Sequence, residues 1–167
     1  MIYNVPLPDD PLDQGDIVDG CPVLQIVTFD RGNPTLSQVS CSTHRVLVLT
    51  QTCDLANQKT QRITVAIVHD AQFLVDQKIV RADDVRGPIR AGRVFGWYFL
   101  PRFAACGLCE SIVDLRQLHT APRQVLDALC EAGQRKARIQ PLYREHLAKH
   151  FADTFSRIGL PEPYETD

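Results

Sequence analysis

The sequence predicts an α+β domain in which a strongly bent β-sheet is followed by C-terminal helices. Two short runs, residues 45–51 and 62–69, are almost continuous in apolar and β-branched side chains, which is typical of strands buried on both faces. The short polar stretch between them favours an antiparallel pair. Beyond residue 120, apolar side chains recur every three or four positions, which is the spacing of amphipathic helices. With 167 residues, of which 44% are hydrophobic, the chain is the size of a single domain with its own core.

The N-terminal part of the chain divides into a leader, a strand and a loop. Residues 1–14 are rich in proline and acidic side chains, so we expect an extended, mobile leader. Residues 15–28 favour a first strand that bends near Gly20 and Pro22. Residues 30–44 are rich in Asp, Gly, Asn, Pro, Thr and Ser, which indicates a loop.

The middle of the chain adds further strands to the β core, which we expect to span residues 15–118. A polar turn is expected at residues 54–59, directly after the first apolar run. Residues 70–92 mix apolar and charged side chains and favour a short helix or an irregular insertion. Aromatic residues at 93–101 predict a strand that ends at a proline, and residues 111–115 predict another short strand.

The region 120–160 is expected to form two C-terminal helices. The first spans about residues 122–132, with Thr120 as its N-cap and Gly133 as the residue that ends it. Its apolar positions share one face.

The second C-terminal helix is expected to begin at Pro141, because proline is favoured at the first helical position. Its apolar stripe consists of Leu147, Phe151, Phe155 and Ile158, at spacings of four, four and three residues. We expect this stripe to pack on the sheet. If the helix detaches, the same stripe becomes a ligand for a groove on another protein.

Composition and charge narrow the classes of function. The net charge of −2 and the isoelectric point near 6.2 argue against a strongly basic protein that coats nucleic acid, although they leave room for a local basic patch. The N-terminus has neither the basic nor the apolar region of a signal peptide, and no apolar run is long enough to cross a bilayer. We therefore expect a cytoplasmic protein whose six cysteines are free thiols.

Several segments, taken in order, resemble the PemK/MazF toxin family. Residues 15–18, Gly-Asp-Ile-Val, are similar to the opening strand of that family, and residues 45–50 are similar to its second long strand, which begins with Arg and ends in Ser or Thr. Asn57 falls where the family often has Asn. Residues 64–69 correspond to the next strand, and residues 111–120 resemble the late strand and the turn that follows it.

This sequence departs from the family pattern in three places. Val46 stands where the family usually has proline, residues 50–57 do not match, and the helix at 141–158 extends beyond a usual toxin. Residues 50–55 instead resemble a Ser/Thr-Gln-x-Cys-Asp-Leu motif of uncharacterised bacterial proteins, which carries no known activity.

The family resemblance implies a fold, an activity and partners. The fold is an SH3-like barrel, here a strongly bent β-barrel with C-terminal helices. The activity is that of an endoribonuclease toxin or a degenerate relative of one. The expected partner is RNA or another protein, and the chain is a candidate for a homodimer.

Cleavage of RNA by attack of its 2′-hydroxyl needs a group that accepts a proton, a group that protonates the leaving oxygen and a cation for the phosphate. Arg45 matches the strand-initial Arg of the family and Thr50 the residue at its strand end, while Asp54 and His69 are suited to an acid–base pair. The predicted catalytic set is Arg45, Thr50, Thr52, Cys53, Asp54 and His69. The alternative is that these residues form a solvated strand end and a local turn.

A second chemical hypothesis makes Cys53 a nucleophile with His69 as its base. Asp54, directly beside Cys53, disfavours the thiolate. An inert thiol at a strand end is therefore the favoured alternative.

A third hypothesis is a zinc site. Cys41 with His44, and Cys106 with Cys109, form two pairs with knuckle-like spacing, and four such ligands suit tetrahedral zinc. Against this, a domain with its own core does not need zinc to fold, and chance pairs are common among six cysteines. No other cofactor is expected.

Two functions remain open from the sequence. The first is a PemK/MazF-like protein that binds or cleaves RNA. The second is a non-catalytic protein-binding or regulatory module of a bacterial conflict or defence system, which is favoured by the acidic isoelectric point, the replaced motif and the added helix.

Overall fold

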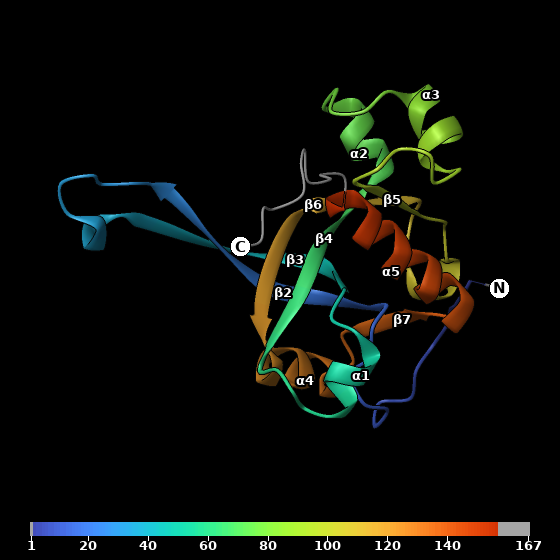
Figure 1. The fold of residues 1–167 in the computed structure, drawn as a ribbon, viewed down its shortest axis with the longest axis horizontal. Helices are drawn as coiled ribbons and strands as arrows, with labels where there is room; N and C mark the ends of the chain where they lie inside the picture. The colour runs from blue at the N-terminus through green and yellow to red at the C-terminus, as the bar shows by residue number, and fades with distance from the viewer. Residues whose placement is uncertain (1, 157–167) are drawn as a thin grey trace, which may run out of the picture.

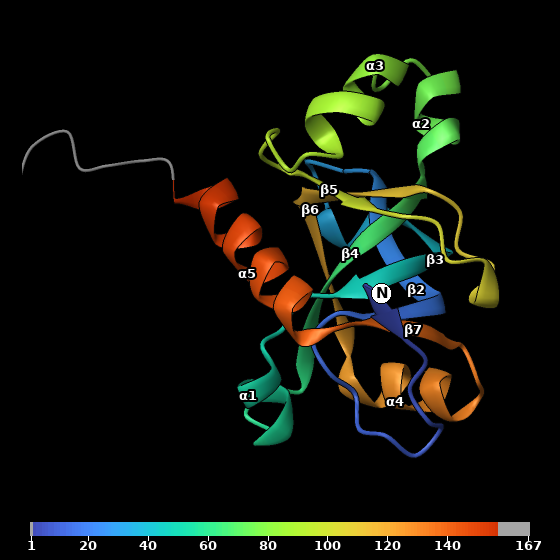
Figure 2. The same ribbon diagram turned by 90° about the vertical axis from the view of Figure 1, so that its right-hand side faces the viewer.

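The computed structural model describes residues 2–156, in which one antiparallel sheet of seven strands is combined with helices (Figures 1 and 2). The predicted α+β class is confirmed. The strands are β1 (Tyr3–Asn4), β2 (Asp16–Thr28), β3 (Gln38–Val48), β4 (Arg62–Asp70), β5 (Trp97–Leu100), β6 (Ser111–Pro122) and β7 (Arg135–Ile139). The helices are α1 (Thr52–Ala56), α2 (Ala71–Asp76), α3 (Ala82–Asp84), α4 (Arg123–Glu131) and α5 (Pro141–Phe155), with single turns η1 (Pro34–Leu36), η2 (Val85–Ile89) and η3 (Ala104–Cys106).

The sheet is strongly curled but open. Its strand order is β1-β7-β2-β3-β4-β6-β5, so β1 and β5 are edge strands that do not pair with each other. The predicted closed barrel is therefore corrected to an open sheet. Side chains connect the two edges of the sheet. The Tyr3 hydroxyl of β1 donates a hydrogen bond to the Pro101 carbonyl, directly after β5, at 2.9 Å, and the Tyr3 ring stacks on Phe103. The predicted antiparallel pairing of β3 with β4 is confirmed.

The two faces of the sheet carry different cores. Leu47 of β3 belongs to a cluster that includes Leu147 of α5, and we call this side the first face. Val48, the next residue, points to the opposite side and belongs to a cluster that includes Leu126 of α4, on the second face. A further cluster, beneath α2 and η2, includes Ile112 of β6. Figure 1 shows α4 and α2 at opposite ends of β4.

The N-terminal segment, which the sequence predicts as an extended leader, is attached to the body of the protein at several points. Tyr3 lies in β1 and is almost fully buried, and Leu12 and Gln14 are buried as well. β1 pairs with β7, a strand that the sequence pattern did not predict. The Gln14 side chain donates to the Leu49 carbonyl at 3.1 Å, which ties the leader to the end of β3.

A buried ion network joins this segment to β7. Asp16 is fully buried and accepts hydrogen bonds from Arg138 at 2.6 and 2.9 Å and from Arg135 at 3.4 Å. The two guanidinium groups also donate to leader carbonyls, among them that of Pro11. The network therefore neutralises a buried carboxylate and satisfies backbone acceptors that would otherwise lose their hydrogen bonds to water.

The hairpin β2–β3 projects from the body as a long two-stranded ribbon (Figure 1). The predicted loop at 30–44 is wrong over residues 38–44, which form the first part of β3. Pairing with β2 outweighs the turn-forming composition of this stretch, since strand formation depends on cross-strand neighbours. Only residues 29–37 form the tip.

Three other boundaries differ from expectation. The predicted turn at 54–59 contains most of helix α1. β5 is limited to four residues, and β6 continues to Pro122 because its second half pairs with β4. Thr120 therefore lies in a strand and does not cap α4.

Helix α5 begins at Pro141 as predicted. Of its predicted stripe, Leu147 is buried and Phe151 packs against the first-face core, whereas Phe155 remains 53% exposed. Ile158 lies outside the described residues. No helix within residues 2–156 has the length and apolar character needed to cross a membrane.

We predict that Asp16→Asn lowers the free energy of unfolding by about 3–5 kcal/mol, because it leaves two largely buried guanidinium groups without a counter-charge. The matched control is Asp153→Asn, which breaks an exposed pair with Lys149 and should cost less than about 1 kcal/mol. Urea unfolding measures both. Equal effects of the two substitutions would contradict the structural importance of the network.

Candidate functional site

The structure separates the members of the predicted catalytic set. Thr50 lies at the end of β3, where its hydroxyl accepts a hydrogen bond from the Thr64 backbone at 2.8 Å. His69 lies five residues farther along β4, at the other end of the strand, roughly 17 Å away at the rise of an extended chain. The predicted acid–base pairing of Asp54 with His69 therefore has no geometric support.

Thr52, Cys53 and Asp54 stay together in the first turn of α1 and are exposed or half-exposed. Asp54 pairs with Lys59 at 3.4 Å. Burial acts to raise the pKa of Asp13 nearby, but a hydrogen bond with Thr52 and the positive charge of Arg144 outweigh it and lower the pKa below its usual value.

Arg45 is held by an ion pair on the first face. Its guanidinium donates to both carboxylate oxygens of Asp19, and it also lies 3.4 Å from the Gly107 carbonyl. Since side chains alternate along β3 and β4, Arg45 and His69 point to opposite faces of the sheet. The two residues cannot act on one phosphate.

The four predicted zinc ligands are also dispersed. Cys41 is exposed on the projecting ribbon, and His44 points to the second face, where its Nε2 hydrogen bonds with the Ser42 hydroxyl at 2.7 Å. Cys106 and Cys109 lie near Arg45 on the first face. Within residues 2–156, no three His, Cys, Asp or Glu side chains are arranged to hold a metal ion.

The second face instead brings together three histidines, His44 of β3, His69 of β4 and His119 of β6. Strand alternation places all three on the side of Val48, and each is only partly buried. Extending the β3–β4 register by two residues from the Val46–Ile67 pair sets His44 beside His69. We call these three residues the histidine strip. It occupies the part of the second face between the cores under α4 and α2.

The histidines interact electrostatically. Burial lowers the pKa of His69, and His44 adds to this effect while Asp114 opposes it. Burial and His44 likewise lower the pKa of His119, whose Nε2 is buried without a hydrogen-bond partner within residues 2–156. Near neutral pH, His69 and His119 are therefore mostly uncharged and able to accept a proton.

A cation and an aromatic ring adjoin the strip. Asp114 is buried and accepts hydrogen bonds from Arg116 at 2.8 and 3.0 Å. The Arg116 guanidinium lies 4.6 Å from the ring centre of Trp97, and about half of the arginine side chain is exposed. This corner presents a positively charged group, a flat ring and neutral imidazoles on one side of the sheet.

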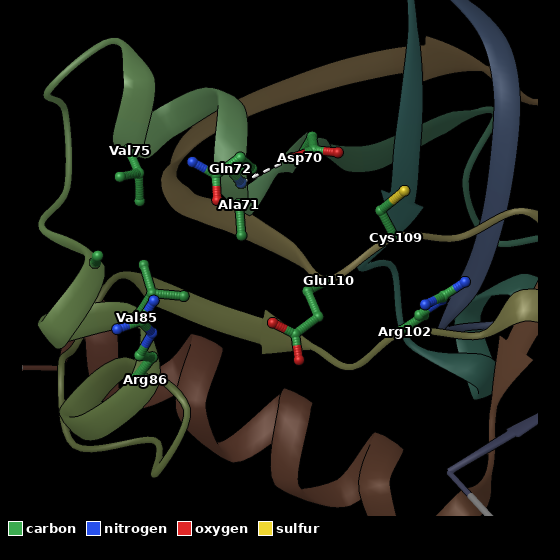
Figure 3. A pocket seen from close by; sticks show the side chains of 10 residues that line it. Asp70, Ala71, Gln72, Val75, Val85, Arg86, Arg102, Cys109 and Glu110 are labelled. Carbon is green, nitrogen blue, oxygen red and sulfur yellow. Dashed lines mark hydrogen bonds between the residues drawn. The ribbon is translucent and has the colours of Figure 1, made fainter.

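A polar cleft of about 520 Å³ opens beside α2 (Figure 3). Its two carboxylates are already compensated. Asp70 caps α2 by accepting hydrogen bonds from the backbone N–H groups of Gln72 and Phe73, and Glu110 pairs with Arg90.

Two further arginines, Arg86 and Arg102, line this cleft and have no hydrogen-bond or ion-pair partner within residues 2–156. Figure 3 shows them on opposite sides of Glu110. The cleft therefore carries surplus positive charge, but no histidine lines it.

Two residues of the histidine strip are predicted from the sequence in other roles, and the third is not predicted to have any role. The sequence predicts His69 as a catalytic residue and His44 as a metal ligand. It does not single out His119, which lies in the segment 111–120. Because side chains alternate along a strand, the sequence alone shows that His44 points to the same face as Val46 and Val48. The position of His119 depends on the β4–β6 register, which no local pattern reveals.

Comparisons with known proteins assign neither a family nor a function to this chain. No known family profile matches this sequence, and no curated protein matches it. Among solved structures, one similar chain comes from an endoribonuclease in complex with its cognate antitoxin, from a mycobacterial species. It is 12% identical, with 91% of this chain and 99% of that chain covered and a TM-score of 0.47. Any functional conclusion must therefore rest on the side chains of the site.

We predict that His69 and His119 titrate below pH 6.5 in NMR experiments, and that His44→Gln raises the pKa of both, because it removes a nearby positive charge. His146→Gln on α5 is the control and should leave both values unchanged. Unchanged titration in His44→Gln would show that the three rings do not interact.

We also predict that the protein loses stability as the pH falls below 6.5. Burial, with His146 adding to it, lowers the pKa of His150, so the unfolded chain binds this proton more readily than the folded one. The contribution is fully present above the unfolded value and is lost as the pH falls through the folded value. Urea unfolding of His150→Phe should give a flatter pH dependence; a slope as steep as that of the wild type would contradict the assignment.

Proposed function

We propose that this protein cleaves RNA at the histidine strip, as a PemK/MazF-like endoribonuclease in reaction class but with different catalytic residues. The observation that carries the proposal is the grouping of His44, His69 and His119 on the part of the second face between the cores under α4 and α2. Histidines are the side chains best suited to proton transfer near neutral pH. The resemblance of residues 15–18 and 45–50 to the toxin family supports the same reaction class.

The chemistry needs only groups that the strip provides. One imidazole, neutral, accepts the proton of a ribose 2′-hydroxyl as its oxygen attacks the adjacent phosphorus. A second, protonated, donates to the 5′-oxygen as the phosphorus–oxygen bond breaks, leaving a 2′,3′-cyclic phosphate and a 5′-hydroxyl. The lowered pKa suits His69 to the role of base, and the position of His44 beside it on β3 suits His44 to the role of acid.

The groups around the strip support binding of a single strand of RNA. Arg116 is placed to offset the charge that develops on the phosphate. Trp97, partly exposed beside it, offers a ring for stacking a base. The low net charge of −2 then restricts binding to this local site and disfavours general coating of nucleic acid.

We predict that the purified protein cleaves a single-stranded RNA oligonucleotide and leaves the matching DNA intact, since DNA lacks the 2′-hydroxyl. His69→Gln should reduce the rate by about a hundredfold or more, which is the usual contribution of a general base. Rates come from gel analysis of end-labelled RNA, with 2′,3′-cyclic phosphate ends checked by mass spectrometry.

The matched control is His146→Gln, which changes a histidine on the opposite side of the sheet and should leave the rate unchanged. A contaminating ribonuclease would cleave equally in all three preparations. No cleavage by the wild type, or equal cleavage by His69→Gln, would refute the proposal.

A further inference from the structure

A second pocket, of about 420 Å³, lies where Trp97 of β5 meets the chain segment that follows α2. Both views of the molecule place α2, α3 and β5 at the same end (Figures 1 and 2). Its apolar lining includes Val80, Ile89 and Val94, which are part of the core beneath α2 and η2 or pack against it. Its volume is within the range of about 300–1,000 Å³ that is typical of small-molecule sites. We call it the tryptophan pocket.

The polar lining of the tryptophan pocket carries surplus positive charge. It consists of two cations, Lys78 and Arg81, and one acid, Asp84. Within residues 2–156, none of these three side chains has a hydrogen-bond or ion-pair partner. Cations beside an aromatic ring are the groups with which proteins bind the phosphate and the base of single-stranded nucleic acid.

The backbone at Lys78 is in a conformation that favours glycine. Lys78 has a φ of +59° and directly follows Gln77, the C-cap of α2. The N–H groups of Lys78 and Ile79 donate to the carbonyls of Val75 and Leu74 at 2.9 and 3.0 Å. This is the Schellman motif, in which the left-handed position is usually glycine because glycine has no Cβ. A lysine here strains the backbone, and strain of this kind is concentrated at functional positions.

The tryptophan pocket adjoins the histidine strip. Trp97 pairs with Asp114 of β6, and Asp114 is two residues beyond Ile112, the partner of His69 on β4. Because β6 alone separates β4 from β5, these two strands lie two spacings apart, roughly 10 Å. About one or two nucleotides of an extended strand span this distance. Arg116 packs over the Trp97 ring but does not line the pocket, so the ring is shared between the two sites.

We propose that the tryptophan pocket binds the base and the phosphate of a nucleotide that neighbours the one cut at the histidine strip. The base stacks on Trp97 over the apolar lining, and Lys78 and Arg81 hold the phosphate. Binding in the pocket places the next part of the RNA strand against His69. This inference rests on the proposed cleavage of RNA at the histidine strip, and it adds a binding subsite outside the strip.

The fluorescence of Trp97 tests the proposal directly, because Trp97 is the only tryptophan of the chain. The probe is a 2′-O-methyl RNA tetranucleotide of sequence ACGU, which is not cleaved because its 2′-hydroxyl groups are blocked. It should quench the fluorescence of the full chain, and Arg81→Gln should weaken its binding by about tenfold or more. The slope of log Kd against log salt concentration should also fall by about 0.7, as expected for the loss of one phosphate contact on a single strand.

Lys78→Gly separates binding from folding. It removes a cation but relieves the strained backbone, so this variant should bind the probe more weakly and yet melt at or above the wild-type temperature. The matched control is Arg86→Gln, which removes an exposed arginine of the same insertion that lines the cleft beside α2 instead. This control should bind the probe like the wild type. Circular dichroism gives the melting temperatures.

Three outcomes overturn the proposal. The first is a wild type whose fluorescence the tetranucleotide does not quench. The second is an equal loss of binding in Arg86→Gln and Arg81→Gln, which indicates unspecific attraction by positive charge. The third is binding of adenosine 5′-monophosphate as tight as that of the tetranucleotide, which assigns the pocket to a free nucleotide.

The binding assay involves no cleavage, so its failure is distinguishable from failure of the proposed function. A wild type that binds the tetranucleotide at Trp97 but leaves unmodified RNA uncut supports the subsite and refutes the cleavage. A wild type that cleaves RNA without quenching of Trp97 refutes the subsite alone.

Discussion

The architecture depends on one buried carboxylate. Asp16 sits at the start of β2, and its charge is balanced by Arg135 and Arg138 of β7. Burial of an ion in protein is costly unless partners and hydrogen bonds compensate it, so this carboxylate requires β7 to lie beside β2. Because α5 follows β7 after a single residue, Gln140, the same constraint helps to place α5 against the first face. The same two arginines also hold residues 2–14 against β7, since both donate hydrogen bonds to the Pro11 carbonyl.

Helix α5 and strand β1 cover the first face, and the second face carries two smaller cores. The cores under α4 and α2 occupy its ends, and between them the strands carry histidines where a core would carry aliphatic side chains. Neutral imidazoles tolerate partial burial better than charged groups, and burial lowers the pKa of His69 and of His119 at this position.

Much of the fold was predictable from local patterns. The apolar runs at 45–51 and 62–69 identified β3 and β4, and Pro141 marked the start of α5. The failures have a common cause. β1, β7, the outer half of β3 and the second half of β6 are polar or turn-like in composition, and they are strands because neighbouring strands satisfy their backbone hydrogen bonds. The zinc hypothesis likewise rested on sequence spacing, which says nothing about the face to which a side chain points.

By itself, the sequence determined the α+β class, the main buried strands, the last helix and the kinds of side chain available for chemistry, because these depend on periodicity and residue type over a few positions. The tertiary structure alone decided which of those side chains meet. It separated His69 from Thr50 and Asp54, paired Arg45 with Asp19, and brought His119 near His44. The physical reason is register. A shift of one residue moves every side chain of a strand to the other face, and register is fixed by long-range pairing and by core packing.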